Sequence, residues 1–517
     1  MRLSDIIYNE EYESSGNCGD IEIGAITTNL SEITQDTLFV IIRSIKFDVN
    51  KIINDVSGKR VAILGLGVSN FPLTRMLAES GACASITVFD EKTFEQLGER
   101  AEILSSMGVS FVCGFEGIDA DIIFRSPGLR PDEDEILRAV SNGAYLTSEM
   151  ETFLKYTPAV SFAVTGSDGK TTTTTLTGRF LSCAGNTYVG GNIGTPLLDK
   201  CHEMTDKDFA ALELSSFQLM NMQYSPMNAA ITNVTPNHLD WHTDEGEYAR
   251  AKFNIVGEKT RRLVVNADNE ITRNFGMEIL NTTDKEVFFF SSKTNDYSSV
   301  FEQKNVRASL FCVYDGAICK TGGEGYERIL PLDAIKIPGK HNVENYMTAI
   351  ALTYGYVEIE SYEQVAKDFF GVEHRLELVR EKDGVQFYNG SIDSSPTRTI
   401  AALSALEGRD IVVICGGYDK KLDYAPLASA LIKQVRAVVL TGATAEKIKL
   451  ALYADEGLKN SNLQIIHKPE FEDAVFAAAE LGREGGCVLL SPASASFDRF
   501  DNFMVRGNYF KELVGKL

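Results

Sequence analysis

The chain has 517 residues and a formal net charge of −22, which limit the classes of protein that it can belong to. One hydrophobic core rarely serves a chain of this length, so we expect about three domains. The excess of carboxylates repels nucleic acids and anionic membrane surfaces, and we expect neither as a partner. The sequence shows no apolar run of membrane-spanning length and no signal-peptide pattern, so we predict a cytoplasmic protein.

The nine cysteines are scattered and include no Cys-x-x-Cys pair. This spacing argues against a disulfide framework or a structural zinc site and favours a reducing compartment. Cys113 and Cys415 lie in apolar runs, and we predict that both are small core residues.

Residues 1–56 form an unusual N-terminal extension, acidic at its start, in which residues 36–42 predict a buried strand. Strands are then predicted at 60–64, 85–89 and 121–124, separated by helical stretches. Gly65-Leu66-Gly67 follows the first of these strands and Asp90 ends the second, which approaches a dinucleotide-binding fingerprint. Asn70 replaces the third glycine, so a tight turn without a ligand is the alternative. If the protein were a dehydrogenase that uses this fingerprint, the glycine-rich motif at 160–173 would have no explanation.

The segment from Val160 to Thr173 predicts a strand, a tight glycine turn and a helix in direct succession. Backbone N–H groups at such a turn converge on phosphate oxygens. Lys170 adds a point charge, and the Thr171 hydroxyl suits Mg²⁺. The full Walker spacing needs a glycine where this chain has Val164, so the loop is a shortened variant. An ordinary turn containing Gly-Lys-Thr is the alternative, but the strand–loop–helix context favours a nucleoside triphosphate site.

Three residues behind this loop carry groups that suit ATP chemistry. Glu213 ends a β-rich run, where a carboxylate can hold Mg²⁺ opposite Thr171. His238 lies in a predicted loop and Lys252 on a predicted helix. Taken singly, each is more often a surface or turn residue. All three are candidates for the ATP site because they follow the same phosphate loop along the chain.

The remaining chain continues the α/β pattern. Residues 285–337 are rich in β-forming residues, and later strands are predicted at 410–415, 437–440, 463–466 and 487–490. The predicted fold class is α/β in three domains: 1–156 Rossmann-like, 157–371 a P-loop ATPase-type sheet, and 372–517 again Rossmann-like.

Blocks in order from about residue 57 to the C-terminus resemble the Mur ligase superfamily, the ATP-dependent amide ligases of peptidoglycan precursor synthesis. They are 165–171, 191–194, 213–219, 233–240, 248–252, 341–345, 374–375, 416–420 and 490–497. The block Glu213-Leu-Ser-Ser-Phe-Gln-Leu219 is similar to the D-glutamate-adding branch. The resemblance implies ATP-dependent addition of D-glutamate to UDP-N-acetylmuramoyl-L-alanine through an acyl phosphate, by a monomer.

The resemblance also implies roles for individual residues. The catalytic set is Lys170, Glu213, His238 and Lys252, and the ligands of two Mg²⁺ ions come from Thr171, Glu213, His238 and Lys252, the last as a carbamate. The ATP site comprises Gly166, Ser167, Asp168, Gly169, Lys170, Thr171, Thr172, Asn342, Asn345 and Arg375. The UDP-linked substrate contacts Val68, Ser69, Asp90, Lys92, Ser126, Asn192, Ser215 and Gln218. D-Glutamate contacts Lys420, Ser496, Phe497 and Phe503 of the C-terminal domain.

The chain departs from the family pattern in three places. Gly390 and Ile392 stand where relatives often have aspartate and lysine, and Asp393 is a candidate to compensate. Asn237 precedes His238 where many relatives have an acidic residue. Residues 23–48 resemble, faintly, the opening of the diamino-acid-adding and D-Ala-D-Ala-adding ligases.

Two further hypotheses stay open at this point. Another Mur-type ligase, such as the L-alanine-adding enzyme or a folylpolyglutamate synthetase, would share the phosphate loop. A non-catalytic nucleotide-binding relative would account for Gly390 and Ile392, although the intact Lys170, Glu213 and Lys252 argue against it.

Overall fold

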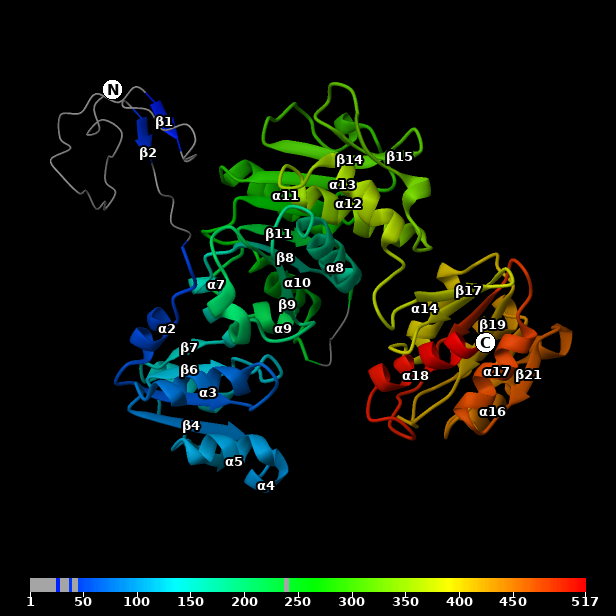
Figure 1. The fold of residues 1–517 in the computed structure, drawn as a ribbon, viewed down its shortest axis with the longest axis horizontal. Coiled ribbons are helices and arrows are strands. Elements are labelled where there is room, and N and C mark those ends of the chain that lie inside the picture. The colour runs from blue at the N-terminus through cyan, green and yellow to red at the C-terminus, as the bar shows by residue number, and fades with distance from the viewer. Residues whose placement is uncertain (1–24, 28–36, 40–44, 237–240) are drawn as a thin grey trace.

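The computed structural model describes residues 25–27, 37–39, 45–236 and 241–517 and arranges them mainly as three α/β sheets in sequence (Figure 1). This confirms the predicted fold class. A small parallel pair, β1 (Ala25–Thr27) with β2 (Thr37–Phe39), precedes them. The strand predicted over 36–42 is thus present at Thr37–Phe39, and its other residues lie outside the described part.

The first sheet has five parallel strands in the order β5-β4-β3-β6-β7. Its strands are β3 (Arg60–Leu64), β4 (Ser85–Asp90), β5 (Ser110–Cys113), β6 (Ile122–Arg125) and β7 (Tyr145–Thr147). The helices of this part are α2 (Val49–Val56), α3 (Asn70–Ser80), α4 (Phe94–Leu97), α5 (Glu99–Ser106), α6 (Asp134–Ser141) and α7 (Glu149–Tyr156). The strand order reverses between β3 and β6, and ligands of such sheets bind at that switch point.

The central sheet has nine strands in the order β16-β15-β14-β13-β12-β11-β8-β10-β9. They are β8 (Val160–Thr165), β9 (Thr187–Gly191), β10 (Phe209–Glu213), β11 (Asn228–Ile231), β12 (Arg262–Asn266), β13 (Glu286–Ser291), β14 (Ala308–Tyr314), β15 (Ala317–Thr321) and β16 (Glu327–Pro331). The strands from β9 to β14 pair in parallel, and β14, β15 and β16 form an antiparallel meander, as the β-rich sequence at 285–337 predicts.

The helices of the central region follow its strands in the chain. They are α8 (Lys170–Leu181), η2 (Leu197–Glu203), α9 (Ser216–Leu219), α10 (Glu245–Phe253), α11 (Glu270–Thr282), η3 (Tyr297–Ser299), η4 (Leu332–Ala334), α12 (Lys340–Thr353) and α13 (Ile359–Asp368). β8 lies between β11 and β10 and is buried from Ser161 to Thr165, as is usual for a central parallel strand.

The C-terminal sheet has six strands in the order β17-β18-β22-β19-β20-β21, with only β17 antiparallel to its neighbour. Its strands are β17 (Glu377–Lys382), β18 (Val385–Asn389), β19 (Ile411–Cys415), β20 (Ala437–Leu440), β21 (Gln464–His467) and β22 (Cys487–Leu490). Its helices are α14 (Pro396–Ala405), α15 (Ala425–Gln434), α16 (Ala445–Ala454), η5 (Glu456–Asn460), α17 (Phe471–Leu481) and α18 (Phe503–Lys516).

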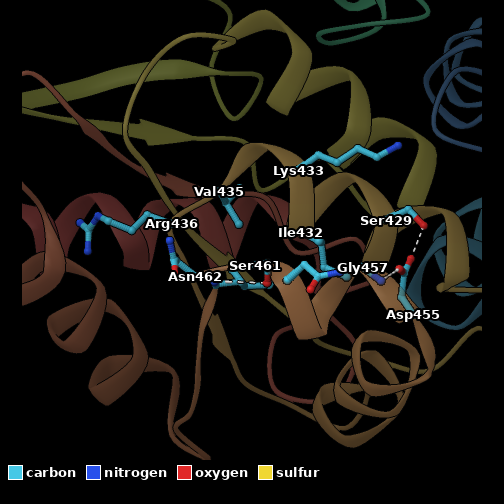
Figure 2. A pocket seen from close by; sticks show the side chains of 11 residues that line it. Ser429, Ile432, Lys433, Val435, Arg436, Asp455, Gly457, Ser461 and Asn462 are labelled. Atoms are coloured by element: carbon cyan, nitrogen blue, oxygen red, sulfur yellow. Dashed lines mark hydrogen bonds between the residues drawn. The ribbon is translucent and has the colours of Figure 1, made fainter.

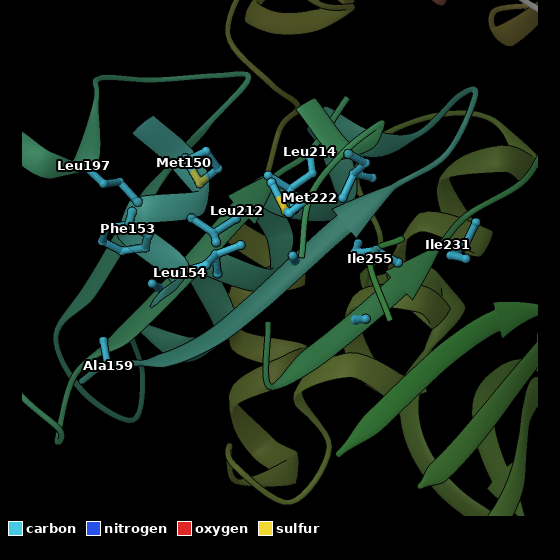
Figure 3. Packing of buried hydrophobic residues seen from close by; sticks show 14 of the residues in the cluster. Met150, Phe153, Leu154, Ala159, Leu197, Leu212, Leu214, Met222, Ile231 and Ile255 are labelled. Carbon is cyan, nitrogen blue, oxygen red and sulfur yellow. The ribbon is translucent and has the colours of Figure 1, made fainter. Parts of the chain in front are cut away.

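One buried hydrophobic cluster runs from the first sheet into the central one. Figure 3 shows part of it, where Met150, Phe153 and Leu154 of α7 lie near Leu212 of β10 and Leu214, which directly follows that strand. The C-terminal sheet is packed by separate clusters on its two faces. The predicted boundaries near 156 and 371 stay predictions.

The structure also bears on the predictions about cysteines and membrane-spanning segments. Cys415 is buried as predicted, but Cys113 is exposed, because β5 is an edge strand and its last residue faces solvent. None of the helices in the described segments is both long and apolar enough to cross a membrane.

Candidate active site

The predicted phosphate loop joins the end of β8 to the start of α8. Gly166 has a φ of 149°, and an added Cβ would lie 1.9 Å from Thr232 Oγ1. Gly169 has a φ of 80°, and an added Cβ would lie 2.3 Å from Asn345 Oδ1. Both positions therefore require glycine, because a larger residue would be strained and would also clash. The turn brings the N-terminus of α8 to the carboxyl edge of the central sheet.

Asn233 holds this loop in place, and the sequence reasoning did not select it as a site residue. Its Oδ1 accepts hydrogen bonds from the backbone N–H of Ser167 at 3.2 Å and of Asp168 at 2.9 Å. Ser167 Oγ donates to Thr235 O at 2.9 Å and lies 3.1 Å from Tyr248 Oη. The only sequence signal for Asn233 was its place at the start of the block 233–240.

Lys170 is the first residue of α8 and folds back over the loop. Its Nζ donates to the carbonyls of Gly166 at 2.9 Å and Ser167 at 3.0 Å. Burial lowers the pKa of Lys170, while the negative charges of Glu213 and Asp168 act in the opposite direction. A cation is thus fixed at the mouth of the loop. Thr171 follows it in the first turn of α8, and Thr172 is buried beside it.

Glu213 lies on the neighbouring strand, level with Val164 of β8. Its Oε1 accepts a hydrogen bond from Asn192 Nδ2 at 2.9 Å. Its Oε2 is buried and has no hydrogen-bond partner among the described residues. A buried carboxylate oxygen without a partner is costly unless a cation binds it. Glu213 beside Lys170 and Thr171 therefore fits a divalent cation.

Lys252 on α10 is 1% exposed, so the solvated alternative for this helical lysine is wrong. Its Nζ donates to Gly166 O at 2.8 Å and lies 4.4 Å from the ring centre of Tyr248. Burial, reinforced by the positive charge of Lys170, lowers the pKa of Lys252 to about 6. Its amine is then largely neutral at pH 7.

The other predicted metal ligand, His238, lies outside the described residues. In the segments that the structure describes, no three His, Cys, Asp or Glu side chains are grouped as a metal cluster. Mg²⁺ is commonly held by one or two carboxylates together with substrate phosphates and waters. The donor set of Glu213 and Thr171 fits that mode.

Two of the predicted ATP-site residues, Asn342 and Asn345, lie where two helices meet. Asn345 Nδ2 donates to Asn342 Oδ1 at 3.0 Å, and Asn345 Oδ1 accepts from Thr173 Oγ1 at 3.3 Å, so α12 is tied to α8. Arg375 lies before β17, yet its charge interacts with those of Glu213 and Asp168, and burial lowers its pKa. The contact of Arg375 with ATP stays a prediction.

The predicted uridine-diphosphate contacts gather at the switch point of the first sheet. Asp90 Oδ2 accepts from Leu66 N at 2.7 Å, and its Oδ1 accepts from Lys92 N at 3.0 Å. Ser126 follows β6, and an added Cβ on Gly65 would lie 2.9 Å from its Cβ. Val68 is 63% exposed on the same loop, directly before Ser69. The structure thus brings these residues to one edge.

Three other predicted substrate contacts have partners within the protein. Ser215 and Gln218 form a reciprocal capping box at the start of α9, with Ser215 N donating to Gln218 Oε1 at 2.9 Å and Gln218 N donating to Ser215 Oγ at 3.2 Å. Asn192 is bonded to Glu213, as described above. Their assignment to substrate stays a prediction.

The predicted D-glutamate residues lie at the carboxyl ends of the adjacent strands β19 and β22. Tyr418 N donates to Ala495 O at 2.8 Å, which brings the segment of Lys420 beside that of Ser496. Lys420 is exposed, Ser496 is buried and Phe497 is 62% exposed. Phe503 begins α18, where its carbonyl accepts from Ser391 Oγ at 2.8 Å. All four thus belong to one edge of the C-terminal sheet.

Two arginines that the sequence reasoning missed connect the first sheet to the central one. Arg125 is 1% exposed, and its Nη2 donates to Phe217 O at 3.0 Å and Asn221 Oδ1 at 2.7 Å. Arg130 Nη2 forms an ion pair with Glu247 Oε1 at 2.8 Å. The loop that carries Ser126 is therefore fixed against α9 and against α10, the helix of Lys252.

A cavity of about 610 Å³ in the C-terminal domain is separate from this site (Figure 2). It is lined by Ser429, Arg436, Asp455 and Asn462 among others, and it lies before the first residues of β20 and β21. Asp455 is bonded to Ser429 and Gly457 N, and Arg436 to Asp410. This is the edge of the sheet opposite to Lys420 and Ser496.

Comparison with known proteins agrees with this geometry. Residues 164–353 match the model of the Mur ligase middle domain, and residues 374–494 match that of the Mur ligase glutamate ligase domain. The UDP-N-acetylmuramoylalanine--D-glutamate ligase of Ruminiclostridium cellulolyticum is 45% identical over 472 residues, covering 90% of this chain and 98% of that protein. The protein of the same name from Clostridium acetobutylicum is 44% identical over 480 residues, covering 91% and 100%.

A solved structure shares the fold at lower identity. The crystal structure of UDP-N-acetylmuramate-alanine ligase from Thermotoga maritima is 18% identical, has a TM-score of 0.51, and covers 89% of this chain and 99% of that one. Together with the relatives above, the matched domains show that this chain belongs to the Mur ligase family.

Proposed function

We propose that this protein is an ATP-dependent ligase that adds D-glutamate to UDP-N-acetylmuramoyl-L-alanine in the cytoplasm, as a monomer. One observation carries the proposal: Lys170 Nζ and Lys252 Nζ both donate to Gly166 O, next to a strand that ends in Glu213, whose buried Oε2 has no partner among the described residues. This places two basic groups and one carboxylate around a phosphate loop. The relatives of more than 40% identity carry the name of this activity.

The triphosphate would bind at the loop 166–171. Backbone N–H groups of the loop and the N-terminus of α8 would bind phosphate oxygens. Lys170 would exchange its bonds to Gly166 O and Ser167 O for bonds to phosphate oxygens. Asn342, Asn345 and Arg375 would complete the nucleotide site.

Mg²⁺, which we propose as two ions, would neutralise negative charge on the phosphates and the substrate carboxylate. Thr171 and Glu213 would hold one ion, and His238 and a carbamylated Lys252 would hold the other. Carbamylation requires a neutral amine, which then bonds to CO₂ and loses a proton. The lowered pKa of Lys252 supplies that neutral form at pH 7.

In the reaction, the carboxylate of the UDP-linked substrate attacks the γ-phosphorus of ATP, and ADP leaves. The amine of D-glutamate then attacks the acyl carbon, inorganic phosphate leaves, and the amine loses a proton. Lys170 would balance the charge that moves between the β- and γ-phosphates. Lys420 and Ser496 would bind the carboxylates of the incoming amino acid.

Phosphate release tests this proposal. The purified protein is incubated with ATP, Mg²⁺, UDP-N-acetylmuramoyl-L-alanine and D-glutamate, and each component is omitted in turn. We expect sustained release only in the complete mixture. Lys170→Ala and Glu213→Ala should abolish it while circular dichroism stays unchanged, because both side chains act on the nucleotide and not in the core. Release that continues in either variant would contradict the site.

A further inference from the structure

Arg125 is a buried arginine at the carboxyl end of the first sheet. It is the last residue of β6 and lies level with Leu64, the last residue of β3. The strand order reverses between these two strands, and the predicted contacts of the uridine diphosphate gather there. Ser126, which follows Arg125 directly, is one of those contacts.

One nitrogen of the guanidinium binds backbone carbonyls of the loop 126–129. Nη1 of Arg125 donates to Ser126 O and to Pro127 O, each at 3.3 Å, and also to Leu129 O. The loop starts on the sheet, where Ser126 N donates to Leu64 O at 2.8 Å, and it is closed by Leu129 N, which donates to Ser126 O at 3.1 Å. The start of the loop is thus held by β3 and its carbonyls by Arg125.

The other terminal nitrogen of the same guanidinium reaches α9. Nη2 donates to Phe217 O at 3.0 Å and to Asn221 Oδ1 at 2.7 Å. Phe217 lies between Ser215 and Gln218, two predicted contacts of the UDP-linked substrate. A guanidinium is planar and holds its N–H donors in a fixed arrangement. One rigid group therefore sets the spacing between two groups of predicted substrate contacts, one beside the first sheet and one beside the central sheet.

The charge of Arg125 is surrounded by neutral acceptors. Within the described segments its guanidinium bonds to four carbonyl oxygens and one amide oxygen and forms no ion pair, and its buried Nε has no hydrogen-bond partner. Burial lowers the pKa of Arg125 to about 10, so the group still carries its charge at pH 7. A buried charge without a carboxylate partner is costly for stability. Proteins keep such costs mainly at functional sites.

We infer that Arg125 is a positioning residue for the UDP-linked substrate: its guanidinium holds the loop 126–129 at a fixed distance from α9, so that one substrate molecule meets the contacts on both. The inference rests on the proposed function and adds to it a residue that acts through Ser126, Ser215 and Gln218. Lysine at this position would keep the charge but not the bridge, because its ammonium is a single point charge.

Two ligands of different length separate this spacing role from general damage to the site. In the proposed site UDP would reach only the edge of the first sheet, whereas UDP-N-acetylmuramoyl-L-alanine would extend to α9. Calorimetry measures the Kd of both. For Arg125→Lys we expect the Kd of the UDP-linked substrate to rise about tenfold, as the loss of a charge-assisted hydrogen bond predicts, while the Kd of UDP stays close to that of the unmodified protein. Arg138→Lys, at an exposed position of α6, is the matched control and should change neither constant.

A second variant guards against misfolding of the first. Asn221→Ala removes one acceptor on the α9 side, at a half-buried position, and leaves the bonds of Arg125 to the loop carbonyls in place. Its Kd for the UDP-linked substrate should rise about threefold, with the Kd of UDP unchanged. If thermal unfolding shows that Arg125→Lys is not folded, Asn221→Ala decides. An equal loss of affinity for both ligands, or an unchanged Kd for the UDP-linked substrate, would overturn the inference.

These measurements use neither ATP nor an amino acid. A protein that shows this binding pattern but does not ligate D-glutamate would contradict the proposed function and leave the inference intact. A working D-glutamate ligase whose Arg125→Lys and Asn221→Ala variants bind the UDP-linked substrate normally would do the reverse.

Discussion

Burial changes the chemistry available to Lys252. An exposed lysine is protonated at neutral pH, whereas Lys252 has a pKa near 6 and bonds to the carbonyl of Gly166. The sequence made Lys252 a candidate site residue because it follows the phosphate loop along the chain, after Glu213 and His238. It could not predict burial, because α10 has no clear apolar stripe and its buried residues Tyr248, Ala249, Ala251 and Lys252 are mixed in character.

Lys252→Ala should be nearly inactive, and added short-chain carboxylates should restore part of its activity, because a small acid can enter the space vacated by the carbamate. Arg250→Ala, an exposed position on the same helix, should keep full activity. Phosphate release measures both. If intact-mass analysis of the active enzyme finds Lys252 without added CO₂, the carbamate role is wrong.

Lys420→Ala should raise the KM for D-glutamate far more than the KM for ATP. Lys420 is exposed at the amino-acid edge of the C-terminal sheet, and a carboxylate bound there would lose its cation. Lys421→Ala is the neighbouring control and should change neither constant. Equal increases in both constants for Lys420→Ala would indicate general damage to the domain instead.

Other residues show where sequence reasoning stopped. Gly166 and Glu213 were predicted because their types and spacing are required by phosphate and metal chemistry. Asn233, Arg125 and Arg130 were not, since each works through contacts with distant segments. Gly390 was noted as a lost aspartate, but only the structure shows that Asp393 fills the adjacent space.

At the scale of elements, strands were easier to predict than very short helices. The predicted strands at 60–64, 437–440 and 487–490 match β3, β20 and β22. Very short elements were not predicted: α9 is a four-residue helix fixed by its own capping box. Such elements lack the periodic apolar pattern by which a sequence identifies longer helices.

Helix α7 carries a buried acid whose titration should affect stability. Glu149 is fully buried, its Oε1 lacks a partner among the described residues, and burial raises its pKa from 4.5 to about 7. Between these two values the folded state holds a proton that the unfolded state has lost, so this group makes the protein less stable as the pH rises.

Glu149→Gln stays neutral, so it should be more thermally stable than the unmodified protein at about pH 8, and the difference should shrink toward about pH 5. Thermal unfolding at both values measures this. Glu133→Gln, at the exposed start of α6, should show no such pH-dependent difference. A constant difference for Glu149→Gln would mean that Glu149 does not titrate in this window.

At the scale of the whole molecule, the sequence predicted three α/β units in order, and the structure confirms them. It could not predict how the units join, because the joining contacts come from residues far apart in the chain. The first and central sheets share one hydrophobic cluster and the contacts of Arg125 and Arg130. The C-terminal sheet has its own clusters, and the charges of Arg375 and Arg398 act on Lys170 of the central one. The predicted UDP-linked substrate site is therefore built on a joined pair of units, and the amino acid site on a third.

The central claim is that D-glutamate is the amino acid that this enzyme joins to the UDP-linked carboxylate. The most direct measurement is mass spectrometry of the nucleotide-linked product after incubation with ATP, Mg²⁺, UDP-N-acetylmuramoyl-L-alanine and an equimolar mixture of D-glutamate, L-alanine, D-alanine and meso-diaminopimelate. We predict a single product whose mass increases by one glutamate residue, formed in equal amount to ADP and phosphate. A product carrying any other amino acid, or ATP hydrolysis without a ligated product, would contradict the claim.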